Sequence, residues 1–157
     1  MSPKAARTLE ASAARFELEL SIEAPLPAVW QAIVDEPNSW WIPGLRCVSG
    51  DSEMVLDARA GGHLVERNDS GGSLLWFTVI AVEPQQSINL AGSMAPPFGG
   101  PCQTFLLIEV EEKGGSTIVR MTNSLHGHID EGMLPSMEAG WRDLLENGLK
   151  RFVEGRG

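Results

Sequence analysis

The stretch "RFELELSIEAPLPAVWQAIVDEP", residues 15–37, changes from one hydrophobic period to another and so sets the order of the first two elements. From Phe16 to Ile22 every second residue is apolar, which is the period of a strand with one buried face. After two prolines the apolar residues recur at helical spacing, as in an amphipathic helix. The sequence therefore predicts a strand over 15–24 and a helix that ends at Pro37.

The next segment, "NSWWIPG" over 38–44, places two large aromatic side chains next to each other in a short stretch bounded by prolines. It predicts one extra helical turn. Adjacent residues point about 100° apart on a helix, so the two rings cannot enter one core in the same direction. We therefore expect Trp40 to pack against the first helix and Trp41 to face the mouth of a pocket.

Strand follows strand between residues 52 and 126. Glycines and prolines mark the turns, beginning with a hairpin around Gly61-Gly62, and the loop "APPFGGP" over 95–101 separates two strand pairs. Residues 132–154 then carry an apolar stripe at helical spacing. The order of a strand, a helix, a helical turn, six strands and a long helix predicts an α+β protein with an antiparallel sheet of six or seven strands.

Length and charge narrow the class of protein. A chain of 157 residues is most simply one domain, with residues 1–14 as a disordered leader and 15–157 as the folded part. No run approaches the ~20 apolar residues of a membrane helix, the N-terminus has no secretory signal, and two cysteines without CxxC spacing fit a reducing compartment. We expect a cytoplasmic protein without membrane insertion. The net charge of −9 argues against nucleic acid as a partner.

One amphipathic helix cannot cover a wide, twisted antiparallel sheet closely, so we expect a gap between the two. Two glycines inside the last helix, Gly140 and Gly148, each cost about 1 kcal/mol relative to alanine and therefore need a reason. Close approach of a backbone or a ligand is one reason. Accommodation of a large neighbour such as Trp141 is the other.

Five segments carry a resemblance to a known family: "FELELSIEAPLPAVWQAIVDEPNSWW", "DARAGGHL", "VIAVEPQQSINLAG", "GGSTIVRMTNS" and "AGWRDLLENGLKRFVE". In this order, over residues 15–154, the chain resembles the START/birch-pollen-allergen (SRPBCC) superfamily, and within it the branch named for the activator of the heat-shock-protein-90 ATPase. The resemblance implies a helix-grip fold, in which a curved antiparallel sheet wraps around a long C-terminal helix and two short helices follow the first strand. It also implies a deep, mostly apolar pocket between sheet and helix.

Members of the superfamily carry lipids or hormones, or cyclise polyketides, so the resemblance leaves the function open. Nine residues are predicted to bind a ligand in the pocket: Trp41, His63, Trp76, Met94, Phe98, Met121, Asn123, Met137 and Trp141. Methionine and tryptophan suit loosely specified apolar ligands but are equally common in cores. Asn123 stands where many relatives of the branch have a histidine. Facing inward by strand parity, it either pairs with tryptophan or backbone groups or meets a polar group of a ligand.

Catalytic signals are weak. His126, His128 and Asp130 in "HGHID" offer two or three ligands for a metal, or else lie in an exposed link before the last helix. His63 offers a general base, or else pairs with a carboxylate or lies in solvent. Motifs for nucleophilic, phosphate-binding, zinc-protease and dinucleotide chemistry are absent from the sequence. We therefore predict no catalytic residue, no metal and no cofactor.

These observations favour a binding domain, monomeric or homodimeric, whose partner is a small apolar or aromatic, lipid-like molecule. One alternative is an enzyme of the cyclase, dehydratase or hydrolase kind that works in the same pocket. A second alternative, suggested by the name of the branch, is a cofactor of a chaperone ATPase.

Overall fold

One antiparallel sheet with the strand order β1-β7-β6-β5-β4-β3-β2 dominates the computed structural model, which describes residues 10–156. The strands are β1 (Ser12–Ile22), β2 (Ser52–Leu56), β3 (His63–Asn68), β4 (Ser73–Glu83), β5 (Ser87–Met94), β6 (Cys102–Lys113) and β7 (Ser116–Gly127). Every neighbouring pair is antiparallel. The predicted sheet of six or seven strands is confirmed, and the number is seven.

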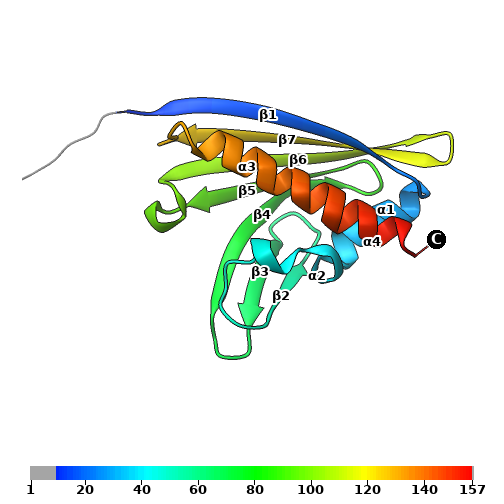
Figure 1. Cartoon of the computed structure of the whole chain (residues 1–157), viewed down its shortest axis with the longest axis horizontal. Helices are drawn as coiled ribbons and strands as arrows, with labels where there is room; N and C mark the ends of the chain where they lie inside the picture. The colour runs from blue at the N-terminus through cyan, green and yellow to red at the C-terminus, as the bar shows by residue number, and fades with distance from the viewer. Residues whose placement is uncertain (1–9, 157) are drawn as a thin grey trace, which may run out of the picture.

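The helices lie against one face of this curved sheet (Figure 1). The first strand is followed by α1 (Leu26–Asp35), α2 (Pro37–Trp40) and the short 3-10 turn η1 (Pro43–Leu45), and a second such turn, η2 (Pro96–Phe98), follows β5. The C-terminal helix is continuous through α3 (Met133–Asp143), the π-helical segment η3 (Leu144–Lys150) and α4 (Arg151–Glu154). It crosses the sheet diagonally, with α1 against α4 and α2 against η3. The helix-grip arrangement predicted from the sequence is thereby confirmed.

The first strand begins earlier than the sequence suggested. Ser12, Ala13 and Ala14 pair with Gly127, His126 and Leu125 of β7, although we had assigned them to a disordered leader. Their small side chains carry no strand period, and the partner strand supplies the backbone hydrogen bonds instead. The rest of the expected leader, residues 1–9, lies outside the described residues.

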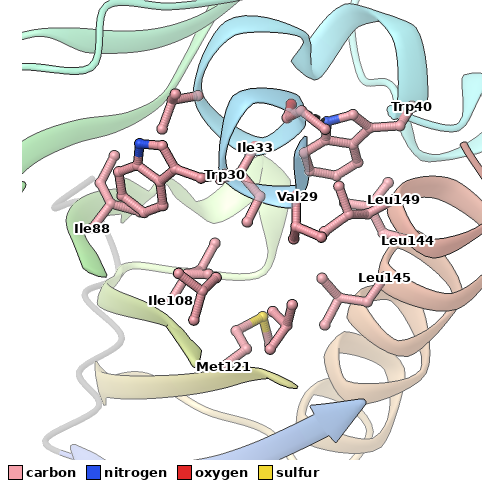
Figure 2. Close-up of a cluster of buried hydrophobic side chains, with 14 of the residues drawn as sticks. Val29, Trp30, Ile33, Trp40, Ile88, Ile108, Met121, Leu144, Leu145 and Leu149 are labelled. Carbon is pink, nitrogen blue, oxygen red and sulfur yellow. Dashed lines mark hydrogen bonds between the residues drawn. The ribbon is translucent and has the colours of Figure 1, made fainter. Parts of the chain in front are cut away.

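The main hydrophobic core fills the space between the sheet, α1 and the C-terminal helix. Figure 2 shows Val29 of α1 facing Leu145 and Leu149 of η3, with Ile108 and Met121 below them on the sheet. All five are buried. Each large apolar side chain that leaves water contributes about 1.5–3 kcal/mol, so this cluster fixes how the helix lies on the sheet.

The two helix glycines play different roles. A Cβ on Gly148 would lie 2.5 Å from the backbone carbonyl oxygen of Trp40, so the absence of a side chain lets α2 pack directly on η3. A Cβ on Gly140 would meet nothing nearer than 4.0 Å, at a side-chain carbon of Leu45. Gly148 is therefore explained by close approach of backbone, whereas Gly140 leaves open space beside the helix.

A β-bulge in β4 re-aims two neighbouring aromatic residues. Leu64 of β3 pairs with Phe77, and Val65 pairs with Leu75, which leaves Trp76 without a partner in the ladder. An extra residue of this kind shifts the alternation of side chains along the strand by one. Trp76 and Phe77 consequently both reach the same interior space, although they are adjacent in sequence.

Candidate functional site

A pocket of about 270 Å³ lies where α3, the segment after α2 and strands β4 to β6 meet. Aromatic rings form much of its wall: Trp41, Trp76, Phe77 and Trp141. No charged side chain of the described residues lines it. The walls are therefore suited to apolar surface, with a small number of polar groups left to orient a bound molecule.

Trp41 stands at the centre of the aromatic wall. Its ring centroid lies 5.1 Å from that of Trp76 and 5.9 Å from that of Trp141, and both pairs meet edge to face. The Trp40 ring centroid lies 5.7 Å from that of Trp41, with the two ring planes tilted by 33°. Edge-to-face pairs add about 0.5–1.5 kcal/mol each beyond the area they bury, so the wall is a stiff unit.

Of the two adjacent tryptophans, Trp41 lies differently from our expectation. Trp40 packs toward the first helix, as expected, and its indole N–H donates to the Ala32 carbonyl over 2.7 Å. Trp41 lines the pocket, but only 4% of it is exposed, so it forms the inner wall rather than the mouth. The exposed side chains of Leu75 (52%) and Phe98 (48%) mark the mouth instead.

The structure brings six of the nine predicted binding residues together around the pocket: Trp41, Trp76, Met94, Phe98, Met137 and Trp141. It places the other three elsewhere. His63 is exposed, with its Nδ1 atom 3.4 Å from the Thr78 hydroxyl and its side chain on the face of β3 opposite the buried Leu64. Met121 is fully buried in the main core.

Asn123, the third of these residues, lies behind the pocket wall and is fully buried. Its side-chain amide N–H donates to the Thr104 hydroxyl oxygen over 2.7 Å and to the Phe105 carbonyl over 3.2 Å. Its Oδ1 atom has no partner among the described residues. Thr104, which was not among the predicted residues, lines the pocket itself.

A buried carboxylate supports the aromatic wall from behind. Glu66 is fully buried and accepts four hydrogen bonds: from the backbone N–H groups of Cys47 (3.0 Å) and Val48 (2.8 Å), the Ser52 hydroxyl (2.9 Å) and the Trp76 indole (2.9 Å). Burial by itself raises the pKa of Glu66, but these hydrogen bonds outweigh it and hold the pKa below its ordinary value. The ionised carboxylate thus fixes Trp76 and the loop beside it.

Glu66 was not among the residues predicted from the sequence, although a signal for it was present. The strand "HLVERN" places Glu66 on the same face as Leu64, two residues earlier, and Leu64 is an obvious core residue. A charged side chain on a core face needs partners. Three of the four partners come from the segment 47–52, which carries no sequence pattern that predicts this contact.

Cys47 lies beside this carboxylate at the edge of the pocket and is exposed, without a disulfide. Partial burial, and after it the negative charge of Glu66, raises the pKa of the Cys47 thiol above its ordinary value. The thiol is therefore protonated at neutral pH and is a poor nucleophile.

The "HGHID" segment has a structural role at its last residue. Asp130 Oδ1 accepts hydrogen bonds from the backbone N–H groups of Gly132 (3.0 Å) and Met133 (2.9 Å), which caps the start of α3. His126 and His128 are exposed. Within residues 10–156 no three histidine, cysteine, aspartate or glutamate side chains gather as a metal site would require.

The seven-stranded sheet around a long C-terminal helix defines an α+β, helix-grip-like protein. No protein-family model matches the chain, and no curated protein matches it. Several solved structures, however, are similar to it. A putative uncharacterized protein from Rhizobium leguminosarum is similar with a TM-score of 0.72 at 21% identity, over 92% of this chain and 97% of the other.

Two further structures carry names. CalU16 from Micromonospora echinospora has a TM-score of 0.63 at 20% identity, over 93% of this chain and 84% of its own. The Aha1 dimer from Colwellia psychrerythraea has a TM-score of 0.60 at 23% identity, over 92% of this chain and 99% of its own. These likenesses are consistent with the superfamily that the sequence resembles, and at such identities they show the fold alone.

The length and hydropathy of the helices among the described residues can be compared with those of a membrane-spanning helix. None of them is long and apolar enough to cross a bilayer.

Proposed function

We propose that this protein is a binding domain for a small apolar or aromatic molecule, held in the tryptophan-lined pocket between the sheet and α3. The observation that carries the proposal is the combination of about 270 Å³ of space with walls that hold no charged side chain of the described residues. A cavity of ~150 Å³ accommodates benzene, so this pocket suits a molecule of about two fused rings rather than a sterol or a long acyl chain.

An enzyme in the same pocket is less well supported. General acid-base catalysis needs titratable groups within reach of a reacting atom. The one titratable side chain on the pocket lining of the described residues is the Cys47 thiol, whose raised pKa makes it a poor nucleophile. Glu66 is occupied by four donors behind the wall. The alternative of a chaperone cofactor rests on the name of the branch that the sequence resembles and on the name of the Aha1 neighbour.

Equilibrium dialysis against 2-ethylnaphthalene tests the proposal. At about 0.5 kcal/mol per non-hydrogen atom, this two-ring hydrocarbon binds with a Kd of roughly 10–100 µM. The Gly140→Leu variant places a branched side chain at the pocket lining and abolishes binding, whereas the matched Gly140→Ala variant leaves most of the space and retains it. The proposal is contradicted if the unmodified protein binds neither this hydrocarbon nor the ketone 2-acetylnaphthalene, or if the Gly140→Leu variant binds as well as the unmodified protein.

A further inference from the structure

Some polar groups of the pocket wall already donate their hydrogen to another group of the protein, and others do not. The Trp76 indole N–H donates to Glu66, and the Trp41 indole N–H points at the Leu45 carbonyl over 3.5 Å. Ser93 donates to the Gln103 side chain on the outer face of the sheet. These groups have no hydrogen left for a ligand, and the Cys47 thiol at the edge of the pocket is only a weak donor, so Thr104 is the strong donor group that remains.

The orientation of the Asn123 amide fixes the role of the Thr104 hydroxyl. The Phe105 carbonyl oxygen can only accept a hydrogen bond, so the Asn123 atom 3.2 Å from it is the nitrogen. That same nitrogen lies 2.7 Å from Thr104 Oγ1 and donates to it. The hydroxyl oxygen is therefore used as an acceptor, and the hydroxyl hydrogen remains to be donated.

No hydrogen bond from the Thr104 hydroxyl to an acceptor is present among residues 10–156, although Thr104 is 96% buried, with 4% exposed. A buried donor without an acceptor is costly, at about 1–3 kcal/mol. Thr104 also lines the pocket, on the inner side of β6 between the walls formed by β5 and α3. A molecule in the pocket is thus in a position to supply the missing acceptor.

We propose that the pocket selects a neutral ring compound with one hydrogen-bond acceptor, such as a ketone, which receives the Thr104 hydroxyl hydrogen. This inference rests on the proposed function, because it names the class of ligand for the same pocket. Asn123 holds the hydroxyl in the donor role by occupying its oxygen.

The acceptor belongs to an uncharged group because the surroundings disfavour an anion. No cationic side chain of the described residues lines the pocket, and the Glu66 carboxylate lies 2.9 Å from the indole nitrogen of one wall residue, Trp76. A carboxylate brought into this pocket would lose its hydration without gaining a partner of opposite charge. A neutral carbonyl group loses far less hydration free energy than a carboxylate when it enters the pocket.

Three probes of nearly equal shape test the inference: 2-ethylnaphthalene, 2-acetylnaphthalene and 2-naphthoate, each measured by equilibrium dialysis at neutral pH. The ketone differs from the hydrocarbon by one carbonyl oxygen. One net hydrogen bond corresponds to about a fivefold preference, so the ketone binds about fivefold more tightly than the hydrocarbon. The naphthoate binds more weakly than either.

Two variants connect the preference to one hydroxyl group. Thr104→Val keeps the shape of the side chain and removes the hydroxyl, so the affinity for 2-acetylnaphthalene falls to that for 2-ethylnaphthalene. Thr104→Ser keeps the hydroxyl and the preference. The comparison of probes on the unmodified protein needs no variant, so the inference stays testable if Thr104→Val folds poorly.

The outcomes separate the two proposals. If neither the hydrocarbon nor the ketone binds, the proposed function fails. Equal binding of hydrocarbon and ketone leaves the binding function intact and overturns the role of Thr104. A naphthoate that binds more tightly than the ketone, or a preference that survives in Thr104→Val, overturns it as well.

Discussion

Replacement of Glu66 by glutamine is the sharpest test of how the pocket wall is held in place. The two side chains have nearly the same shape, so packing is unchanged. The carboxylate offers two acceptor oxygens to four donors: Oε1 receives Val48 N–H and Ser52 O–H, and Oε2 receives Cys47 N–H and Trp76 N–H. An amide has one acceptor oxygen and must point its own N–H groups at one of these two pairs.

The less harmful orientation of the glutamine places its nitrogen at the Oε1 position. The Ser52 hydroxyl can then rotate and accept, but the Val48 N–H faces another donor and loses its partner. A buried donor left unpaired costs about 1–3 kcal/mol. The bonds that remain lose the strength of a charged acceptor, which amounts to about 1 kcal/mol or more. We therefore expect Glu66→Gln to destabilise the protein by about 3 kcal/mol.

Urea denaturation followed by tryptophan fluorescence measures this loss, with an unchanged m-value as the control for two-state unfolding. The pKa of Glu66 is lowered in the folded state, so its contribution is complete above the unfolded-state pKa near 4.5 and is lost as the pH falls through the folded-state value. The stability difference between the two proteins should therefore be constant at neutral pH and shrink below about pH 4.5. A loss under ~1 kcal/mol at pH 7, or a difference that grows on acidification, would refute this account of Glu66.

Three further predictions concern single sites. Gly148→Ala should destabilise the protein by about 1 kcal/mol or more, because its Cβ would lie 2.5 Å from a backbone oxygen. Gly140→Ala on the same helix should instead stabilise the protein by up to ~1 kcal/mol. Thermal unfolding compares the two variants, and a change of stability in the same direction for both would contradict the packing described. Cys47 should react slowly with iodoacetamide at pH 7, and its rate should go on rising with pH beyond the ordinary thiol pKa of 9.0 instead of levelling off there, with buried Cys102 as the unreactive control in mass spectrometry. Asp130→Ala should cost about 1 kcal/mol by removing the cap of α3, measured by urea denaturation, and an unchanged midpoint would show that the cap contributes nothing.

The fold could be predicted because local patterns and tertiary contacts agree along most of the chain. The alternation from Phe16 to Ile22 became β1, and the glycine pair at 61–62 became the β2–β3 turn. The start of β1 could not be predicted, since Ser12–Ala14 have no apolar period and owe their strand conformation to pairing with β7. The π-helical segment within the long helix likewise has no local signal.

The site was predictable only in part, because its polar residues are defined by contacts across the fold. Strand parity correctly turns Asn123 inward, yet it does not say that Thr104 stands between Asn123 and the pocket. The bulge at Trp76 breaks parity altogether and brings Phe77 to the same wall. Glu66 had a signal in its position on a core face, but its partners come from an irregular segment that no periodicity describes.

The pocket and the core share residues, and this decides which variants can separate binding from stability. Trp41 contacts two other pocket tryptophans and is 4% exposed, so truncation to alanine would cost about 3–5 kcal/mol of stability together with any affinity. Because Trp41 is buried in the inner wall, Trp41→Ala does not separate affinity from stability. Gly140 and Thr104 are better sites for separating binding from stability. A side chain added at Gly140, or removal of the Thr104 hydroxyl, changes the pocket without removing buried apolar area. A binding defect in these variants at unchanged stability would therefore report on the pocket itself.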